Sequence, residues 1–191
     1  MSDVVVSQFI TLDGVIESPG PEPGFEHAGW AFQFERGPEV NRFKFTELMS
    51  SGALLLGRVT YEGFAQAWPT MEGTGEFGEK MNNMPKYVVS STLERAEWSN
   101  STIVSGDLGD AVRQLKQTVE GDILVNGSAQ LVQGLLREDL IDELRLMVFP
   151  IVLGSGKRLF GECSEPRTMR VSEVTRAGDT VVAIYRRARV Q

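Results

Sequence analysis

The order of the apolar segments is the feature that most constrains the fold. Before residue 142, short runs of aliphatic and β-branched residues alternate with stretches whose apolar residues recur at helical spacing. The strand-like runs are residues 4–10, 53–56, 88–89, 102–104 and 123–125. Helical patterns begin at Pro38, after Gly57, at Asp107 and after Gly127. Strands that alternate with amphipathic helices are typical of βαβ units and a parallel sheet.

The last part of the chain has a different pattern. Residues 142–152, 169–175 and 180–187 alternate or run apolar, with Gly-rich joints and no helical pattern between them. Ala177-Gly178-Asp179 is a turn signal between the last two runs, which predicts an antiparallel hairpin. We therefore expect an α/β fold with a mixed, mostly parallel central sheet, flanking helices and a C-terminal antiparallel hairpin. No linker-like segment divides the sequence, so residues 1–191 are expected to form a single domain.

Charge and residue usage exclude several classes of function. The formal net charge is −7, which argues against sequence-independent binding to nucleic acid and against docking on an anionic membrane. Cys163 is the only cysteine and His27 the only histidine, so neither an internal disulfide nor a Cys/His zinc site can form, and no metal is expected. The N-terminus lacks a signal-peptide pattern and no apolar run approaches the ~20 residues of a membrane span, which predicts a cytoplasmic protein.

Three of the expected strands end in residues suited to binding phosphate. Ligands of an open α/β sheet bind beyond the carboxyl ends of its parallel strands, where helix N-termini offer free N–H groups. The three strand ends are Gly57-Arg58-x-Thr60, Ser90-Ser91-Thr92 and Gly127-Ser128-Ala129. Each alone is more often an ordinary turn or helix cap. Together they predict a ligand with several phosphates, and an arginine beside two hydroxyls suits an isolated phosphomonoester.

Common nucleotide-binding and hydrolase motifs are missing. There is no Walker A sequence, no G-x-G-x-x-G after the first strand and no G-x-S-x-G elbow. Gly154-Ser155-Gly156-Lys157 lacks the upstream glycine of a P-loop and is interpreted as a turn between strands. His27 is interpreted as an ordinary residue of a loop or pocket rim.

In their order along the chain, these segments resemble the dihydrofolate-reductase-like superfamily, in particular the branch related to the reductase domain of bacterial riboflavin biosynthesis. The resemblance covers nearly the whole chain. The segments that carry it are Thr11-Leu12-Asp13-Gly14-Val15-Ile16, Gly29-Trp30, residues 54–62, residues 85–90, Leu124-Val125-Asn126-Gly127-Ser128, and residues 150–156 with Leu159-Phe160.

The resemblance implies that NADPH lies across the strand ends. The 2′-phosphate would be held by Arg58, Ser90 and Ser91, and the pyrophosphate by Thr60 and the backbone of Gly127, Ser128 and Ala129, with Gly57 permitting a close turn. The nicotinamide would be seated by backbone groups near Phe9 and Ile10, with Ile16 above it. Residues 17–25 would form a mobile lid beside the ring.

The substrate half of the sequence departs from the riboflavin-reductase pattern. That pattern has an acidic residue where Asn126 stands and a second glycine where Ser128 stands, and its Asp-Asn-Pro segment is missing here. We therefore expect a small heterocyclic (pterin- or aminopyrimidine-like) or carbonyl substrate rather than specifically the ribosylaminopyrimidine of riboflavin synthesis. Asn126 and Trp30 are candidate pocket residues, since an aromatic side chain beside a glycine at a loop end often lines a pocket, although Trp30 could also be plain core.

The proton donor is the least defined feature. Asp13 is the candidate catalytic residue, with water as the alternative donor, and Asp13-Gly14 could also be a bare turn. Glu35 and Glu39 lie near the start of the first long helix, but neither falls in register with the carboxylate of dihydrofolate reductases. Two hypotheses follow: an NADPH-dependent reductase that transfers hydride, or a non-catalytic nucleotide-binding or regulatory protein on the same fold.

The apolar stretch 144–149 raises the question of assembly. It is richer in apolar residues than one face of an antiparallel strand requires, and the resemblance implies homodimers built on this part of the sheet. A strand buried on both faces explains the same pattern without a dimer.

Overall fold

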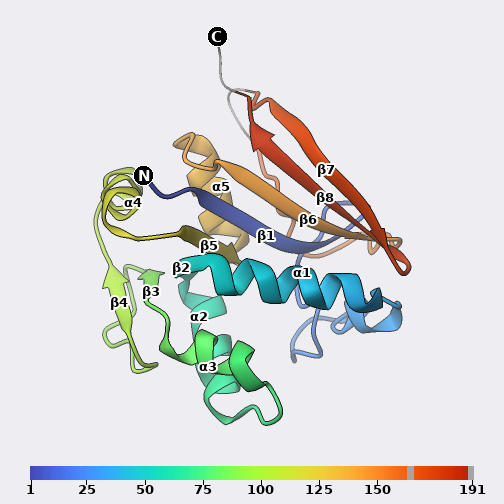
Figure 1. The fold of residues 1–191 in the computed structure, drawn as a ribbon, viewed down its shortest axis with the longest axis horizontal. Coiled ribbons are helices and arrows are strands. Elements are labelled where there is room, and N and C mark those ends of the chain that lie inside the picture. The colour runs from blue at the N-terminus through green and yellow to red at the C-terminus, as the bar shows by residue number, and fades with distance from the viewer. Residues whose placement is uncertain (163–165, 189–191) are drawn as a thin grey trace.

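The computed structural model describes residues 1–162 and 166–188, so Cys163 lies outside the described residues. The described residues form an eight-stranded sheet with the order β4-β3-β2-β5-β1-β6-β8-β7 (Figure 1). The strands are β1 (Val4–Thr11), β2 (Ser51–Gly57), β3 (Lys86–Val89), β4 (Ser101–Val104), β5 (Asp122–Asn126), β6 (Glu143–Phe149), β7 (Met169–Ala177) and β8 (Thr180–Arg187).

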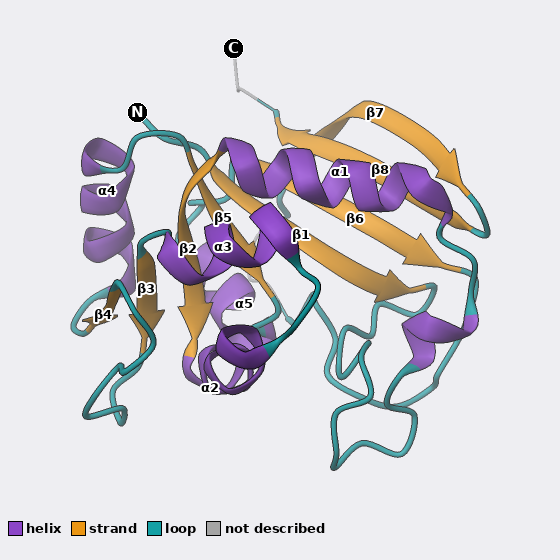
Figure 2. Cartoon of the chain, turned by 60° about the horizontal axis from the view of Figure 1, so that its bottom comes forward, coloured by secondary structure: helices purple, strands orange, loops and turns teal. Residues whose placement is uncertain are grey.

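Helices cover both faces of the sheet (Figures 1 and 2). They are α1 (Gly37–Ser50), α2 (Arg58–Ala67), α3 (Gly75–Asn83), α4 (Leu108–Thr118) and α5 (Ala129–Arg137), with 3₁₀ turns at Trp30–Gln33 and Trp68–Thr70. Alternation along β1 separates the two faces, since successive side chains of a strand point to opposite sides. Val4 and Val6 pack in the core cluster under α4 and α5, whereas Val5 packs in the cluster under α1, α2 and α3.

Strand direction confirms the predicted fold class. The pairs β4–β3, β3–β2, β2–β5, β5–β1 and β1–β6 are parallel, and β8 is antiparallel to both β6 and β7. The C-terminal hairpin is β7–β8, turning at Ala177-Gly178-Asp179 as expected. Because β1, β2, β3 and β5 are parallel neighbours, their carboxyl ends lie at one edge of the sheet. This edge is called the cofactor edge below, after the cofactor that the sequence analysis expects there.

One helix has no counterpart in the sequence-based expectation. Helix α3 was not predicted, because Gly75, Gly78 and two asparagines give it little helix propensity. It is stabilised by tertiary packing instead, with Met81 buried among residues of α1, α2 and β2. The apolar stretch in β6 is explained by its position between β1 and β8, where most of its side chains are buried in one chain.

Helix α1 buries a charged residue as well as its apolar face. Val40 and Leu48 face the sheet as the sequence pattern indicates, but Glu47 is buried beside them.

None of the helices in residues 1–162 and 166–188 combines the length and the hydropathy that crossing a bilayer requires.

Candidate cofactor and substrate site

The Gly-Arg turn after β2 and the Gly-Ser turn after β5 are in direct contact at the cofactor edge. The backbone N–H of Gly57 donates to Ser128 Oγ at 2.9 Å, and the Ser128 hydroxyl donates to Thr60 Oγ1 at 2.8 Å. A Cβ added to Gly127 would lie 2.8 Å from Thr60 Oγ1, so Gly127 has no room for a side chain. The two turns therefore form one packed unit.

Two helices start from this unit without a side-chain cap. Three helices follow directly on a parallel strand, namely α2, α4 and α5. The first turn of α4 is capped by Asp107, which accepts from the N–H of Asp110 at 2.9 Å. Neither α2 nor α5 has such a cap. Their unpaired N–H groups and the positive ends of their dipoles thus lie together at the cofactor edge, which is favourable for a bound phosphate.

The turn after β5 has an unusual backbone. Gly127 and Ser128 both adopt left-handed conformations, with φ of 61° and 60°. This conformation costs a serine ~1 kcal/mol or more relative to glycine. The two hydrogen bonds of its hydroxyl to the Gly57 turn offset that cost, which accounts for serine at this position.

The third strand end joins the same edge. Gly57 at the end of β2 pairs in register with Val89 at the end of β3, which places Ser90 directly after Val89 at that edge. Ser90 Oγ accepts from the N–H groups of Thr92 and Leu93 at 3.2 and 2.9 Å, and Ser91 is exposed.

Arg58 is already paired, but in an exposed position. Its Nη1 donates to both carboxylate oxygens of Glu62, at 3.1 and 2.9 Å, and roughly half of each side chain is exposed. Exposed pairs of this kind contribute ~0.5 kcal/mol, so a phosphate could displace Glu62 at little cost.

Of the residues expected at the nicotinamide, Phe9 and Ile10 are near the end of β1, where they pair with β6, and Ile16 follows the turn after β1. Ile10 and Ile16 are buried in the same apolar cluster. Phe9 is half-buried on the opposite face, where its ring packs against Phe149 with centroids 5.3 Å apart.

Asp13 is held in a turn that keeps it ionised. The hydroxyl of Thr11 donates to its carboxylate at 2.7 Å, and the N–H groups of Gly154 and Leu153 donate at 2.9 and 3.2 Å. The hydrogen bond from Thr11, assisted by these amides, lowers the pKa of Asp13 to about 2 against the desolvation that would raise it. An acid of that strength holds no proton to donate near neutral pH, and its geometry suits anchoring the loop around Gly154.

Trp30 is fully buried and exposes no surface to a ligand. Its indole N–H donates to the carbonyl of Glu17 at 2.8 Å, and its ring packs edge-on against Phe149. It therefore fixes the base of loop 17–25.

Glu35 lies at the β7–β8 turn, where its carbonyl accepts the N–H of Asp179 at 2.7 Å, and Glu39 is exposed at the same end of α1.

Sequence reasoning missed Gln8. Its Nε2 donates to the carbonyl of Gly127 at 2.8 Å and its Oε1 accepts the N–H of Gly127 at 3.2 Å. One backbone donor of the expected pyrophosphate site is thereby occupied, while Ser128 and Ala129 keep theirs. The available signal was a glutamine, next to Ser7, in the middle of the mainly apolar strand β1.

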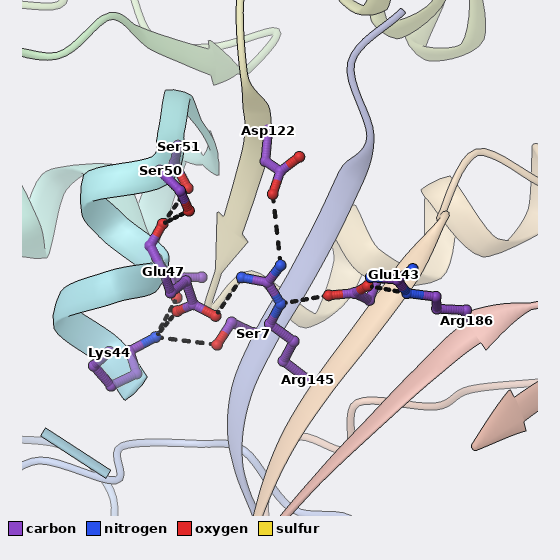
Figure 3. Close-up of polar contacts among 10 residues, drawn as sticks. Ser7, Lys44, Glu47, Ser50, Ser51, Asp122, Glu143, Arg145 and Arg186 are labelled. Atoms are coloured by element: carbon purple, nitrogen blue, oxygen red, sulfur yellow. Dashed lines mark hydrogen bonds and ion pairs between the residues drawn. The ribbon is translucent and has the colours of Figure 1, made fainter. Parts of the chain in front are cut away.

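Sequence reasoning also missed a group of charged residues between α1 and the sheet (Figure 3). Lys44 donates to Glu47 Oε1 at 2.5 Å, to Ser7 Oγ at 3.0 Å and, at the longer distance of 3.4 Å, to Asn126 Oδ1. Asn126, the candidate pocket residue, is thus in contact with this group. The signals were a lysine and a glutamate three residues apart on α1 and an arginine, Arg145, within the apolar strand β6.

Comparisons with known proteins match the whole of this architecture. The family model described as RibD C-terminal domain matches residues 2–183. Two Bacillus subtilis (strain 168) proteins described as uncharacterized are similar: YwjB is 27% identical over 179 residues, covering 94% of each chain, and YyaP is 25% identical over 185 residues, covering 95% of this chain and 92% of its own.

Solved structures share the fold at low sequence identity. A putative riboflavin biosynthesis protein from Shewanella sp. PV-4 aligns with a TM-score of 0.78 and 23% identity, covering 99% of this chain and 100% of its own. Acinetobacter baumannii RibD aligns over 98% of this chain and 58% of its own, with a TM-score of 0.68 and 17% identity. Dihydrofolate reductase from Enterococcus faecalis, complexed with NADP(H), aligns with a TM-score of 0.58 and 18% identity over 97% of this chain and 96% of its own. The fold is therefore dihydrofolate-reductase-like.

Proposed function

The chain belongs to the RibD C-terminal domain family, and on that premise we propose that it is an NADPH-dependent reductase of a small heterocyclic or carbonyl compound. The observation that carries the proposal is the contact of the Gly57 and Ser128 turns. It brings two uncapped helix N-termini and the Thr60 hydroxyl to one edge of the sheet.

The donor set at this edge fits the phosphates of a dinucleotide. A pyrophosphate group needs several N–H donors and an approach to the backbone that no side chain blocks. The space beside Thr60 is free of a side chain because residue 127 is glycine. Arg58, Ser90 and Ser91 would hold the 2′-phosphate, and Thr60, Ser128 and Ala129 the pyrophosphate. The solved dihydrofolate reductase named above carries NADP(H) on the same fold.

The chemistry itself belongs to the cofactor, which supplies hydride when bound. The part played by this chain is to bind and orient. Backbone groups near Phe9 and Ile10 would seat the nicotinamide, with Ile16, which is buried in the same apolar cluster as Ile10, above the ring. Asp13 would hold the 150–158 loop against the end of β1, and the proton would come from water or from a group other than Asp13.

A titration tests the proposal. Binding of NADPH and NADH to the purified protein is followed by fluorescence, for the wild type and for Arg58→Ala. We expect NADPH to bind more tightly than NADH. Arg58→Ala should lower the ratio of the NADH and NADPH dissociation constants about tenfold or more, the effect of losing a charge-assisted hydrogen bond to phosphate.

Arg113→Ala is a matched control, because Arg113 is also a half-exposed helical arginine paired with carboxylates, Asp110 and Glu138. It should leave both dissociation constants unchanged. Equal affinity for NADPH and NADH would remove the assignment of Arg58, and the absence of binding would remove the proposed function.

The alternative is a non-catalytic nucleotide-binding or regulatory protein. It is favoured by one observation, that the carboxylate of Asp13 accepts hydrogen bonds from the backbone N–H groups of Leu153 and Gly154 and so is poorly placed to donate a proton. NADPH oxidation followed at 340 nm with folates, pterins, flavin precursors and quinones separates the two, since a pure binder consumes none.

A further inference from the structure

A network of six charged side chains extends from α1 across one face of the sheet to β8 (Figure 3). Its members are Lys44, Glu47, Asp122, Glu143, Arg145 and Arg186. Three carboxylates and three cations balance one another. A buried ion-pair network seldom adds net stability over apolar residues of the same volume, so packing alone gives no reason for it.

The inner members of the network are committed to one another. Arg145 contacts Glu143 at 2.5 Å, Glu47 at 3.3 Å and Asp122 at 3.5 Å. The Glu47 side chain is only 1% exposed, and its second oxygen accepts from Lys44. Arg145 therefore fixes Glu47, and Glu47 fixes the ammonium group of Lys44.

Lys44 is the member that combines this fixed position with partial access to solvent. Its side chain is 23% exposed, and the longest of its three hydrogen bonds, the 3.4 Å contact with Asn126 Oδ1, is the one that an incoming oxygen atom could replace. Within the described residues, the hydroxyl hydrogen of Ser7 has no acceptor and Asn126 Nδ2 has no hydrogen-bond partner. Two unused donors, on Ser7 and Asn126, thus lie beside the ammonium group of Lys44.

The position of these donors relative to the cofactor edge is set by strand register. Ser7 on β1 pairs with Asn126 on β5, and Asn126 directly precedes Gly127. Phe9 follows Ser7 by two residues and therefore lies on the same face of β1. The donors are accordingly beside the end of β1 that is expected to seat the nicotinamide.

We propose that Lys44, Ser7 and Asn126 bind the carbonyl oxygen of the substrate, and that Glu47 is the positioning residue for Lys44. The inference rests on the proposed function and specifies its substrate class as neutral carbonyl compounds. An acceptor oxygen satisfies the unused donors. A carboxylate would leave an unbalanced negative charge, because the network is already neutral, and burying such a charge is costly.

Ligand-observed NMR on the protein loaded with NADP⁺ tests the assignment. The probes are 2-pyridone, which carries a ring carbonyl, and pyridine, which is of similar size and lacks it. We expect saturation transfer to 2-pyridone and little to pyridine in the wild type. Lys44→Met should weaken 2-pyridone binding about tenfold, the effect of losing one charge-assisted hydrogen bond.

Matched variants separate recognition from folding. Lys116→Met removes another largely buried lysine with a carboxylate partner, Asp142, and should leave the response to 2-pyridone unchanged. If Lys44→Met unfolds because Glu47 loses its partner, Asn126→Ala provides the second variant. It leaves the Lys44–Glu47 pair intact and should also weaken 2-pyridone binding.

The outcomes are distinguishable. Suppose that the wild type binds NADP⁺ tightly, but the wild type, Lys44→Met and Asn126→Ala all give the same response to 2-pyridone, or none of them responds. That result overturns this inference and leaves the proposed function standing. Failure of the wild type to bind NADP⁺ removes the proposed function, and the inference with it.

Discussion

The guanidinium group of Arg58 is held by the carboxylate of Glu62, one helical turn further along α2, through two hydrogen bonds of 3.1 and 2.9 Å. In the proposed site this carboxylate competes with the 2′-phosphate for the same arginine and repels it. The strength with which the protein distinguishes NADPH from NADH should therefore depend on Glu62.

Glu62→Gln should raise the affinity for NADPH about two- to fivefold, because it removes a competing surface ion pair worth ~0.5 to 1 kcal/mol. The affinity for NADH, which has no 2′-phosphate, should not change. Glu138→Gln, which removes a carboxylate partner of Arg113, is the control. An equal gain for both nucleotides would contradict the role given to Arg58.

Gly127→Ala should disrupt the packed unit at the cofactor edge. The new Cβ would meet Thr60 Oγ1 at 2.8 Å, and φ at this residue is 61°. We expect a loss of ~2 kcal/mol or more in the free energy of unfolding, from left-handed strain plus the clash, together with weaker NADPH binding.

Gly73→Ala is the control for that variant, because Gly73 has φ of 72° and open space around its Cβ position. Gly73→Ala should lower the free energy of unfolding only by the smaller amount that backbone strain costs, and it should bind NADPH as the wild type does. Urea unfolding and fluorescence titration measure the two quantities. Similar results for the two variants would show that Gly127 and Thr60 are not in functional contact.

Asp13 should make unfolding sensitive to acid. Its pKa falls from 3.8 to about 2 on folding, so the ionised form is favoured in the native state. The contribution of Asp13 to the free energy of unfolding is fully present above about pH 4, and it is lost as the pH falls from about 4 to about 2. Asp13→Asn should lower the free energy of unfolding at pH 7, and the difference from the wild type should shrink across that range. Parallel curves would contradict the hydrogen-bonded turn.

The outer strand of the sheet predicts a homodimer. Val171 and Val174 on β7 are each about 60% exposed, and Val181 on β8 is exposed beside them. Exposed apolar residues on an edge strand favour association with a second copy. Light scattering at micromolar concentration should give a dimer mass, and Val174→Lys should shift it to the monomer. A monomer mass for the wild type would reject the assembly.

Much of the fold could be predicted because local pattern and tertiary structure agree. The strands β1, β2 and β5 are apolar runs that are buried on both faces, and α4 and α5 carry clear apolar stripes. Helix α3 was missed because tertiary packing overrides the poor helix propensity of its glycines and asparagines. The convergence of the turns at Gly57, Ser90 and Gly127 followed from parallel connectivity alone.

The substrate half was harder to predict, because its residues act through contacts between distant segments. The group around Lys44 joins α1 to β1, β5 and β6, and no local spacing reveals that Glu47 is buried or that Arg145 reaches it. Trp30 and Asp13 had suitable chemistry for a pocket, but one is enclosed in the core and the other is bound to backbone amides. Their roles depend on loops 17–25 and 150–158, and local sequence patterns do not predict the paths of these loops.

A crystal structure of the protein soaked with NADP⁺ tests the central claim most directly. The account predicts nucleotide density along the cofactor edge, with the pyrophosphate between the N-termini of α2 and α5 and the 2′-phosphate within hydrogen-bond distance of Arg58, displaced from Glu62. Nucleotide bound elsewhere on the molecule, or an Arg58 still paired with Glu62 beneath an ordered 2′-phosphate that it does not touch, would contradict it.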